Sequence, residues 1–183
     1  PISLPHPSSL APIADKLGTI AIVSRRRMHV LGEELNRYFR VLNVGTPPSR
    51  NVWSEASSAD LVIGTGRVAY EAMAQGKAVI VSGTNSGRGV SEWMDGYMTE
   101  ELFYNARKNN CSGRYFKKST SKISELLSET EKYTKQSGMD NYSLIAREND
   151  AQIVTSILLG TISGYTDRPS SIYSKAKLFL RRK

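Results

Sequence analysis

Short continuous runs of apolar, mostly β-branched residues alternate along this chain with segments whose apolar residues recur every three or four positions. The continuous runs cover residues 19–23, 61–63 and 78–81, and such runs are typical of strands buried on both faces of a parallel sheet. Residues 40–44 predict a further strand, which ends at a Gly-Thr-Pro-Pro turn. Helical spacing covers 28–39 and 68–75, and 51–58 predicts a short helix or turn. The alternation predicts an α/β fold with a parallel sheet and helices on both faces.

Further elements are expected beyond the fourth strand. Residues 83–89 form a glycine-rich loop, and Thr99 is placed to cap a helix whose first turn contains Glu100 and Glu101. Residues 114–116 are a candidate short edge strand. Helices are predicted around 123–133, 142–159 and 172–180, the last of them basic and amphipathic.

Composition divides the chain into three parts. Residues 1–16 contain four prolines and predict an extended linker. We expect residues 17–165 to form one domain and 166–183 to form a basic C-terminal helix, since residues 168–183 contain six basic residues and no acidic one. The chain begins with Pro1 rather than Met, so we expect a fragment of a longer protein.

The overall composition excludes several classes. With 183 residues, 39% hydrophobic and 23% charged, the chain predicts one globular domain rather than a disordered protein. A single cysteine, Cys111, excludes an internal disulfide, and no apolar run approaches a membrane span. We therefore expect a cytoplasmic protein. The net charge of +8 suits anionic partners such as nucleotide diphosphates, phospholipid head groups or nucleic acid.

The segment 59–81 carries the most specific chemical pattern. A buried strand runs into Gly64, Thr65 and Gly66, and a short helix follows that contains Arg67 and Glu71. Open α/β sheets place their ligands at the carboxyl ends of strands, where free N–H groups of a helix N-terminus can hold a phosphate. We expect the N–H groups of Gly66 and Arg67 to face a diphosphate, with Thr65 and the Arg67 side chain adding further donors.

This segment resembles the C-terminal, donor-binding half of GT-B glycosyltransferases, which transfer a sugar from a nucleotide-sugar. Many of them carry Glu-Gly-Phe-Gly, four further residues, and then Glu-Ala-Met-Ala-x-Gly-x-Pro-Val. Gly64 and Gly66 match the two glycines, and residues 71–79 match the remainder with Ala78 in place of proline. The first glutamate of the pattern falls on Ile63. Similarity to a subset of bacterial members continues through 95–100 and 109–114.

The resemblance implies a Rossmann-like domain that binds a nucleoside diphosphate-sugar as donor substrate, without a further cofactor. By position, Glu71 resembles the family's ribose-binding glutamate. Ser24 and Arg25 stand where the family commonly has Gly-Arg, and this arginine would neutralise the donor phosphates as the bond to the sugar breaks. The acceptor-binding N-terminal domain would be a separate partner that precedes the linker, so the fragment alone would be inactive. With Ile63 in place of the first glutamate, neither the sugar nor the stereochemical outcome is predicted.

Two alternatives remain open at this stage. One is a nucleotide-sugar epimerase of the related two-domain fold, which would need acids and a histidine around the sugar. The other is a non-enzymatic basic module that binds an anionic membrane or nucleic acid. In the glycosyltransferase interpretation, the basic final helix would either dock the enzyme on a bilayer as a peripheral membrane contact or pack back across the missing domain. Nucleic acid ranks lower, because the chain has no aromatic-rich basic motif for RNA. No cluster of His, Cys and carboxylate residues has metal-ligand spacing, so no metal site is predicted.

Overall fold

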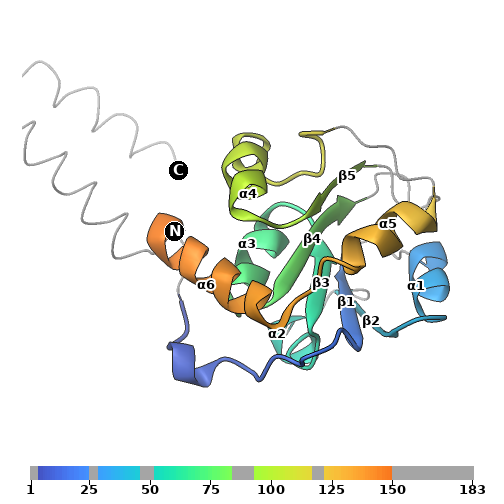
Figure 1. Ribbon diagram of the computed structural model, residues 1–183, viewed down its shortest axis with the longest axis horizontal. Coiled ribbons are helices and arrows are strands. Elements are labelled where there is room, and N and C mark those ends of the chain that lie inside the picture. The colour runs from blue at the N-terminus through green and yellow to red at the C-terminus, as the bar shows by residue number, and fades with distance from the viewer. Residues whose placement is uncertain (1–3, 25–28, 46–51, 84–92, 117–121, 150–183) are drawn as a thin grey trace, which may run out of the picture.

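The computed structural model describes residues 4–24, 29–45, 52–83, 93–116 and 122–149. These residues form an α/β fold around a five-stranded, mostly parallel sheet (Figure 1). The strand order is β2-β1-β3-β4-β5. Four strands are parallel: β1 (Thr19–Val23), β2 (Arg40–Val44), β3 (Leu61–Gly64) and β4 (Ala78–Gly83). The edge strand β5 (Trp93–Tyr97) is antiparallel to β4. The predicted sheet is therefore confirmed in its four parallel strands.

Helices cover both faces of the sheet, as predicted from the sequence (Figure 1). One face packs against α1 (His29–Leu35) and α5 (Ile123–Thr130). The other packs against α2 (Val52–Glu55), α3 (Arg67–Ala74), α4 (Glu100–Ala106) and α6 (Lys135–Asn149). Two 3₁₀ turns, η1 (Pro7–Ser9) and η2 (Arg107–Asn109), complete the described elements. The continuous apolar runs of the sequence are explained by this arrangement, because both faces of the central strands are buried.

Two helix ends behave as their residue types predict. Gly76 follows α3 with φ +67°, a left-handed conformation that glycine adopts without a side-chain penalty. The Thr99 hydroxyl accepts a hydrogen bond of 3.2 Å from the Leu102 N–H at the start of α4.

Two elements differ from the sequence prediction. The segment 114–116 is not a strand, and the edge strand is β5 instead. Phe116 donates its N–H to the Asp95 carboxylate at 3.0 Å, while the Arg114 guanidinium stacks 4.3 Å from the Trp93 ring centre. These residues therefore pack on β5 rather than extend the sheet.

The start of helix α6 was also predicted wrongly from the sequence. It begins at Lys135 rather than near 142, since polar contacts hold its first turns. Asn141 is buried there and donates to the Lys77 carbonyl at 2.9 Å. The rest of the expected helix (150–159) and the basic helix 172–180 lie outside the described residues.

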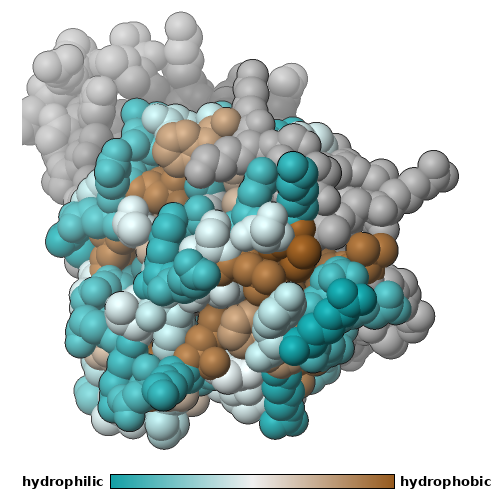
Figure 2. All heavy atoms as spheres, turned by 45° about the vertical axis from the view of Figure 1, so that its right-hand side comes forward, coloured by the Kyte–Doolittle hydropathy of each residue, from teal (hydrophilic) through white to brown (hydrophobic). Residues whose placement is uncertain are grey.

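The proline-rich N-terminal segment lies against the domain in its described part, residues 4–16. The hydroxyl of Tyr142 in α6 donates to the Pro5 carbonyl at 2.8 Å, and that of Tyr133 donates to Ala14 at 2.8 Å. Leu4 packs against the α3 side of the core. A view turned toward the α1 and α5 side shows apolar surface in patches separated by hydrophilic side chains (Figure 2). Within the described residues, no helix is long and apolar enough to cross a membrane.

Candidate functional site

The candidate site lies at the carboxyl edge of the parallel strands. Strands β1, β3 and β4 end there side by side, so the residue after β1, Ser24, lies near the turn that follows β3. A Cβ atom on Gly64 would stand 3.4 Å from the Val23 carbonyl oxygen, which shows how closely the two strand ends approach. The sheet thus brings Ser24 and the 64–67 turn together at the edge where open α/β sheets bind ligands.

Each glycine of the turn is required for a different reason. At Gly64, a Cβ atom would lie 2.4 Å from Cγ1 of Val68 in the first turn of α3. Gly66 has φ +59° and ψ −129°, which side-chain-bearing residues rarely adopt. The chain therefore turns from β3 into α3 more sharply than other residues would allow.

The N–H of Gly66 is already used within the domain. It donates to the carbonyl oxygen of Cys111 at 2.8 Å, so the loop after η2 lies against the glycine turn. The next N–H, that of Arg67, has no acceptor among the described residues. Of the two backbone donors expected to face a diphosphate, the described arrangement leaves that of Arg67 available.

Glu71 is held by two donors on different elements. Its Oε2 accepts a 3.0 Å hydrogen bond from Nε1 of Trp53 in α2, and its Oε1 accepts from Nε of Arg67 in α3. The Glu71 side chain is 23% exposed, whereas that of Arg67 is 88% exposed. Each carboxylate oxygen can accept a second hydrogen bond, so Glu71 can still receive two hydroxyl groups from a ligand.

Trp53 is a candidate site residue that the sequence interpretation missed. It lies in the short segment after β2, and its half-buried indole stands beside the Glu71 carboxylate. An indole offers a flat surface to a heterocyclic base. The available signal was an aromatic residue at a strand-to-helix connection that reaches the carboxyl edge.

Behind the turn, Cys111 is an inert part of the core. The residue is fully buried, and burial raises the pKa of its thiol. Burial also raises the pKa of the Tyr70 hydroxyl beside it. Both groups therefore stay protonated and neutral, which excludes Cys111 as a ready nucleophile.

Asp95 is a second polar group near this edge. It lies on β5 where the pairing with β4 shifts between Val81 and Ser82. Its Oδ1 accepts the Phe116 N–H, and its Oδ2 is buried with no hydrogen-bond partner among the described residues. This carboxylate holds the 111–116 loop against the edge strand.

Some predicted site features lie outside the description. Arg25 follows β1 directly, but residues 25–28 are not described, nor is most of the 83–89 loop. Among the described residues, no group of three or more His, Cys, Asp or Glu side chains could hold a metal ion. Comparison with known proteins gave no matching family model, no matching curated protein and no matching solved structure.

Proposed function

We propose that this domain binds the nucleotide part of a nucleotide-sugar and serves as the donor-binding domain of a glycosyltransferase. The observation that carries the proposal is the Glu71 carboxylate, fixed by Trp53 and Arg67 one helical turn beyond the 64–66 turn. A fixed carboxylate at the carboxyl edge suits a vicinal diol, because its two oxygens can each accept from one hydroxyl.

Each group in the site takes one part of the donor in this proposal. Glu71 accepts hydrogen bonds from the ribose hydroxyls, and the Trp53 indole contacts the base. The diphosphate lies at the start of α3, held by the Arg67 N–H, the exposed Arg67 guanidinium and the Thr65 hydroxyl. Because Gly66 donates to Cys111, its role is to shape the turn rather than to contact phosphate.

The transfer step needs groups that the site does not supply by itself. Ser24 and Arg25 would contact the donor phosphates from the end of β1, where Arg25 stabilises the negative charge that develops on the leaving diphosphate. The acceptor and any base would come from a second domain. The isolated chain should therefore bind nucleotide without turning over a nucleotide-sugar.

A titration followed by two-dimensional NMR tests this proposal. UDP, GDP, ADP and CDP are each added to wild type, to Glu71→Gln and to the matched control Glu101→Gln, an exposed glutamate at the start of α4. We expect saturable shifts at 64–71 with one nucleotide. Because hydrogen bonds to a charged group are lost, Glu71→Gln should weaken affinity about tenfold, while the control should not. The absence of shifts with all four nucleotides would contradict the proposal.

Salt dependence separates this function from the basic-module alternative. Nucleotide binding through one diphosphate should fall modestly with salt and depend on Glu71. Binding of RNA or of anionic vesicles that falls steeply with salt and ignores Glu71→Gln would favour the basic module instead.

A further inference from the structure

The N-terminal segment, residues 4–16, runs along α6 before the chain enters β1 (Figure 1). Apart from the short turn η1, the segment is extended. The residues on either side of η1 have nearly the same backbone angles, φ −64° and ψ 139° at His6 and φ −68° and ψ 138° at Leu10. These angles are close to those of a polyproline II helix, about −75° and +145°. The three prolines of the segment favour this conformation, because the proline ring fixes φ.

Two tyrosine hydroxyls hold the backbone of the N-terminal segment. Tyr142 in α6 donates to the Pro5 carbonyl at 2.8 Å, and Tyr133, which precedes α6, donates to the Ala14 carbonyl at 2.8 Å. A polyproline II backbone has no internal hydrogen bonds, so its carbonyl oxygens are free to accept from a binding surface. Protein grooves that recognise proline-rich peptides are lined by aromatic side chains. The contacts to the segment follow this mode of recognition.

Two glycines make room for the apolar side chains of the segment. A Cβ atom on Gly76 would lie 3.0 Å from Cδ1 of Leu10, and one on Gly138 in α6 would lie 2.5 Å from Cδ1 of Ile13. The Gly138 Cβ would also stand 2.1 Å from the Gly76 carbonyl oxygen, so the two glycines lie together. Leu10 and Ile13 are about one turn apart in a polyproline II helix and therefore share one face. That face fills the space that the glycines leave.

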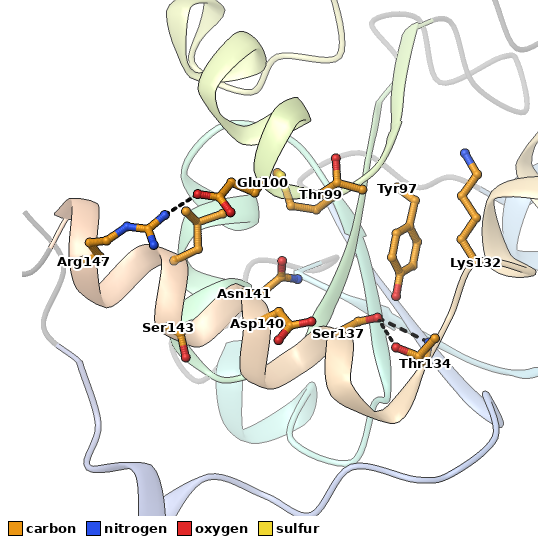
Figure 3. A pocket seen from close by; sticks show the side chains of 12 residues that line it. Tyr97, Thr99, Glu100, Lys132, Thr134, Ser137, Asp140, Asn141, Ser143 and Arg147 are labelled. Carbon is orange, nitrogen blue, oxygen red and sulfur yellow. Dashed lines mark hydrogen bonds and ion pairs between the residues drawn. The ribbon is translucent and has the colours of Figure 1, made fainter.

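Helix α6 is also held to the domain by contacts that do not involve the N-terminal segment. Asn141 donates to the Lys77 carbonyl at 2.9 Å, just before β4 begins. Figure 3 shows the Asn141 side chain above α6, with the N-terminal segment passing below the helix. Leu144 and Ile145 of α6 are buried in the core. The surface that receives the segment can therefore persist when the segment leaves it.

We propose that α6, with Tyr133 and Gly76 beside it, forms a groove that recognises an extended, proline-containing peptide, and that the N-terminal segment is its ligand within the same chain. The groove shares no residue with the donor site proposed above. Only two residues separate the segment from β1, so its effective concentration at the groove is on the order of millimolar. The N-terminal segment thus keeps the groove closed to other proline-containing peptides.

The experiment separates the ligand from the groove. In the whole chain, Leu10→Ser/Ile13→Ser removes both apolar side chains of the ligand and leaves the groove unchanged. Two synthetic peptides are titrated into this variant, one with the natural sequence of residues 4–16 and one with both serines. Amide signals of 135–142 report on the groove, and those of β1 and β3 report on the sheet. Tyr142→Phe is then added to the variant, with Tyr38→Phe, at a side chain that is 60% exposed, as the matched control.

In the double variant, the signals of 135–142 should move from their wild-type positions, because the segment leaves the groove, while those of β1 and β3 should stay. The natural peptide should return the groove signals toward their wild-type positions in a saturable way, and the serine peptide should not. Tyr142→Phe should weaken binding of the natural peptide about fivefold, one neutral hydrogen bond. Tyr38→Phe should leave it unchanged.

Three results would overturn the proposal: the natural peptide does not bind the double variant, the serine peptide binds equally well, or Tyr142→Phe leaves the affinity unchanged. If the double variant does not fold, hydrogen exchange in Tyr142→Phe alone tests the same point. The Ser9 and Leu10 N–H groups, which are bonded within the segment, should exchange about fivefold faster, with no change in β1 and β3. No acceleration, or an equal one in the sheet, would also overturn it. A failure of nucleotide binding at 64–71 leaves these results unaffected.

Discussion

Gly66 and Cys111 are joined by a backbone hydrogen bond of 2.8 Å between the N–H of the first and the carbonyl oxygen of the second. The bond ties the turn between β3 and α3 to the loop after η2, far along the chain. On the loop side, Asn110 and Cys111 both have positive φ, at 53° and 46°. Both partners of this contact thus adopt left-handed backbone conformations, and the contact stabilises the shape of the candidate donor site.

Gly66→Ala should destabilise the domain through backbone strain. A Cβ atom there would meet Asn110 at an ordinary 3.7 Å, so the cost comes from the positive φ and not from a clash. We expect the free energy of unfolding to fall by about 1 to 3 kcal/mol. Urea denaturation measures it. Gly18→Ala is the matched control, because Gly18 does not have a positive φ and its nearest neighbour is 3.6 Å away. Equal effects of the two substitutions would contradict the strain argument.

Gly64→Ala should destabilise for a different reason. Its Cβ would stand 2.4 Å from Cγ1 of Val68, a stiff β-branched side chain that cannot move aside. We expect a loss of about 1 to 3 kcal/mol from overpacking. The double variant Gly64→Ala/Val68→Ala should recover part of that loss, since the clashing methyl groups are gone. A double-mutant cycle in urea measures the coupling, and additive effects would rule out the proposed clash.

The sequence predicted the parts of the fold that depend on local patterns. Strands β1, β3 and β4 were found because strands buried on both faces of a parallel sheet demand continuous apolar runs. The edge strand β2 is mostly half-buried or exposed, and it was found because its mixed run ends at the turn signal of residues 45–48. The end of α3 at Gly76 and the start of α4 at Thr99 were found because capping depends on a single residue type. In the candidate site, the same reasoning located the 64–67 turn at the carboxyl edge.

The missed features depend on contacts between distant segments. Strand β5 contains Asp95 and Gly96, which disfavour strands, and it forms through antiparallel pairing with a register shift against β4. The Trp53–Glu71 hydrogen bond joins two helices, and the Gly66–Cys111 bond joins a turn to a loop. A hydrophobic pattern contains no information on such partners, so the sequence could not reveal that the Gly66 N–H is engaged.

Glu129→Ala should destabilise the domain at the edge strand. Glu129 is 5% exposed, and its Oε2 accepts the buried Tyr97 N–H at 2.8 Å. Without it, that N–H loses its acceptor, which costs about 1 to 3 kcal/mol. Glu129→Gln keeps an acceptor oxygen and should retain most of the stability. Glu125→Ala, on the exposed side of the same helix, should change the free energy of unfolding by less than about 0.5 kcal/mol. Comparable losses at 125 and 129 would refute the role of the buried acceptor.

Lys77 should make a contribution to the stability of the domain that rises with pH in the alkaline range. The residue is 3% exposed, and its Nζ donates to the Ser57 carbonyl at 2.7 Å. Burial lowers the pKa of Lys77 from 10.5, and the nearby Asp60 carboxylate offsets this in part. Between the lowered pKa of the folded state and 10.5, the unfolded chain binds more protons at this residue than the folded chain does. Stability contributed by Lys77 therefore rises with pH in that interval and is constant below it.

The variant Lys77→Met isolates this contribution, because methionine fills similar space without a titratable group. The raised pKa values of Tyr70 and Tyr97 act in the opposite direction, with stability falling as pH rises above about 10. Those tyrosines are present in both proteins, so their effect cancels in the difference. Urea denaturation at a series of pH values from neutral to about 10.5 should show the wild type gaining free energy of unfolding relative to Lys77→Met. If the difference in free energy of unfolding between wild type and Lys77→Met does not change with pH, the folded state does not lower the Lys77 pKa. If the difference shrinks as pH rises, the folded state raises the Lys77 pKa.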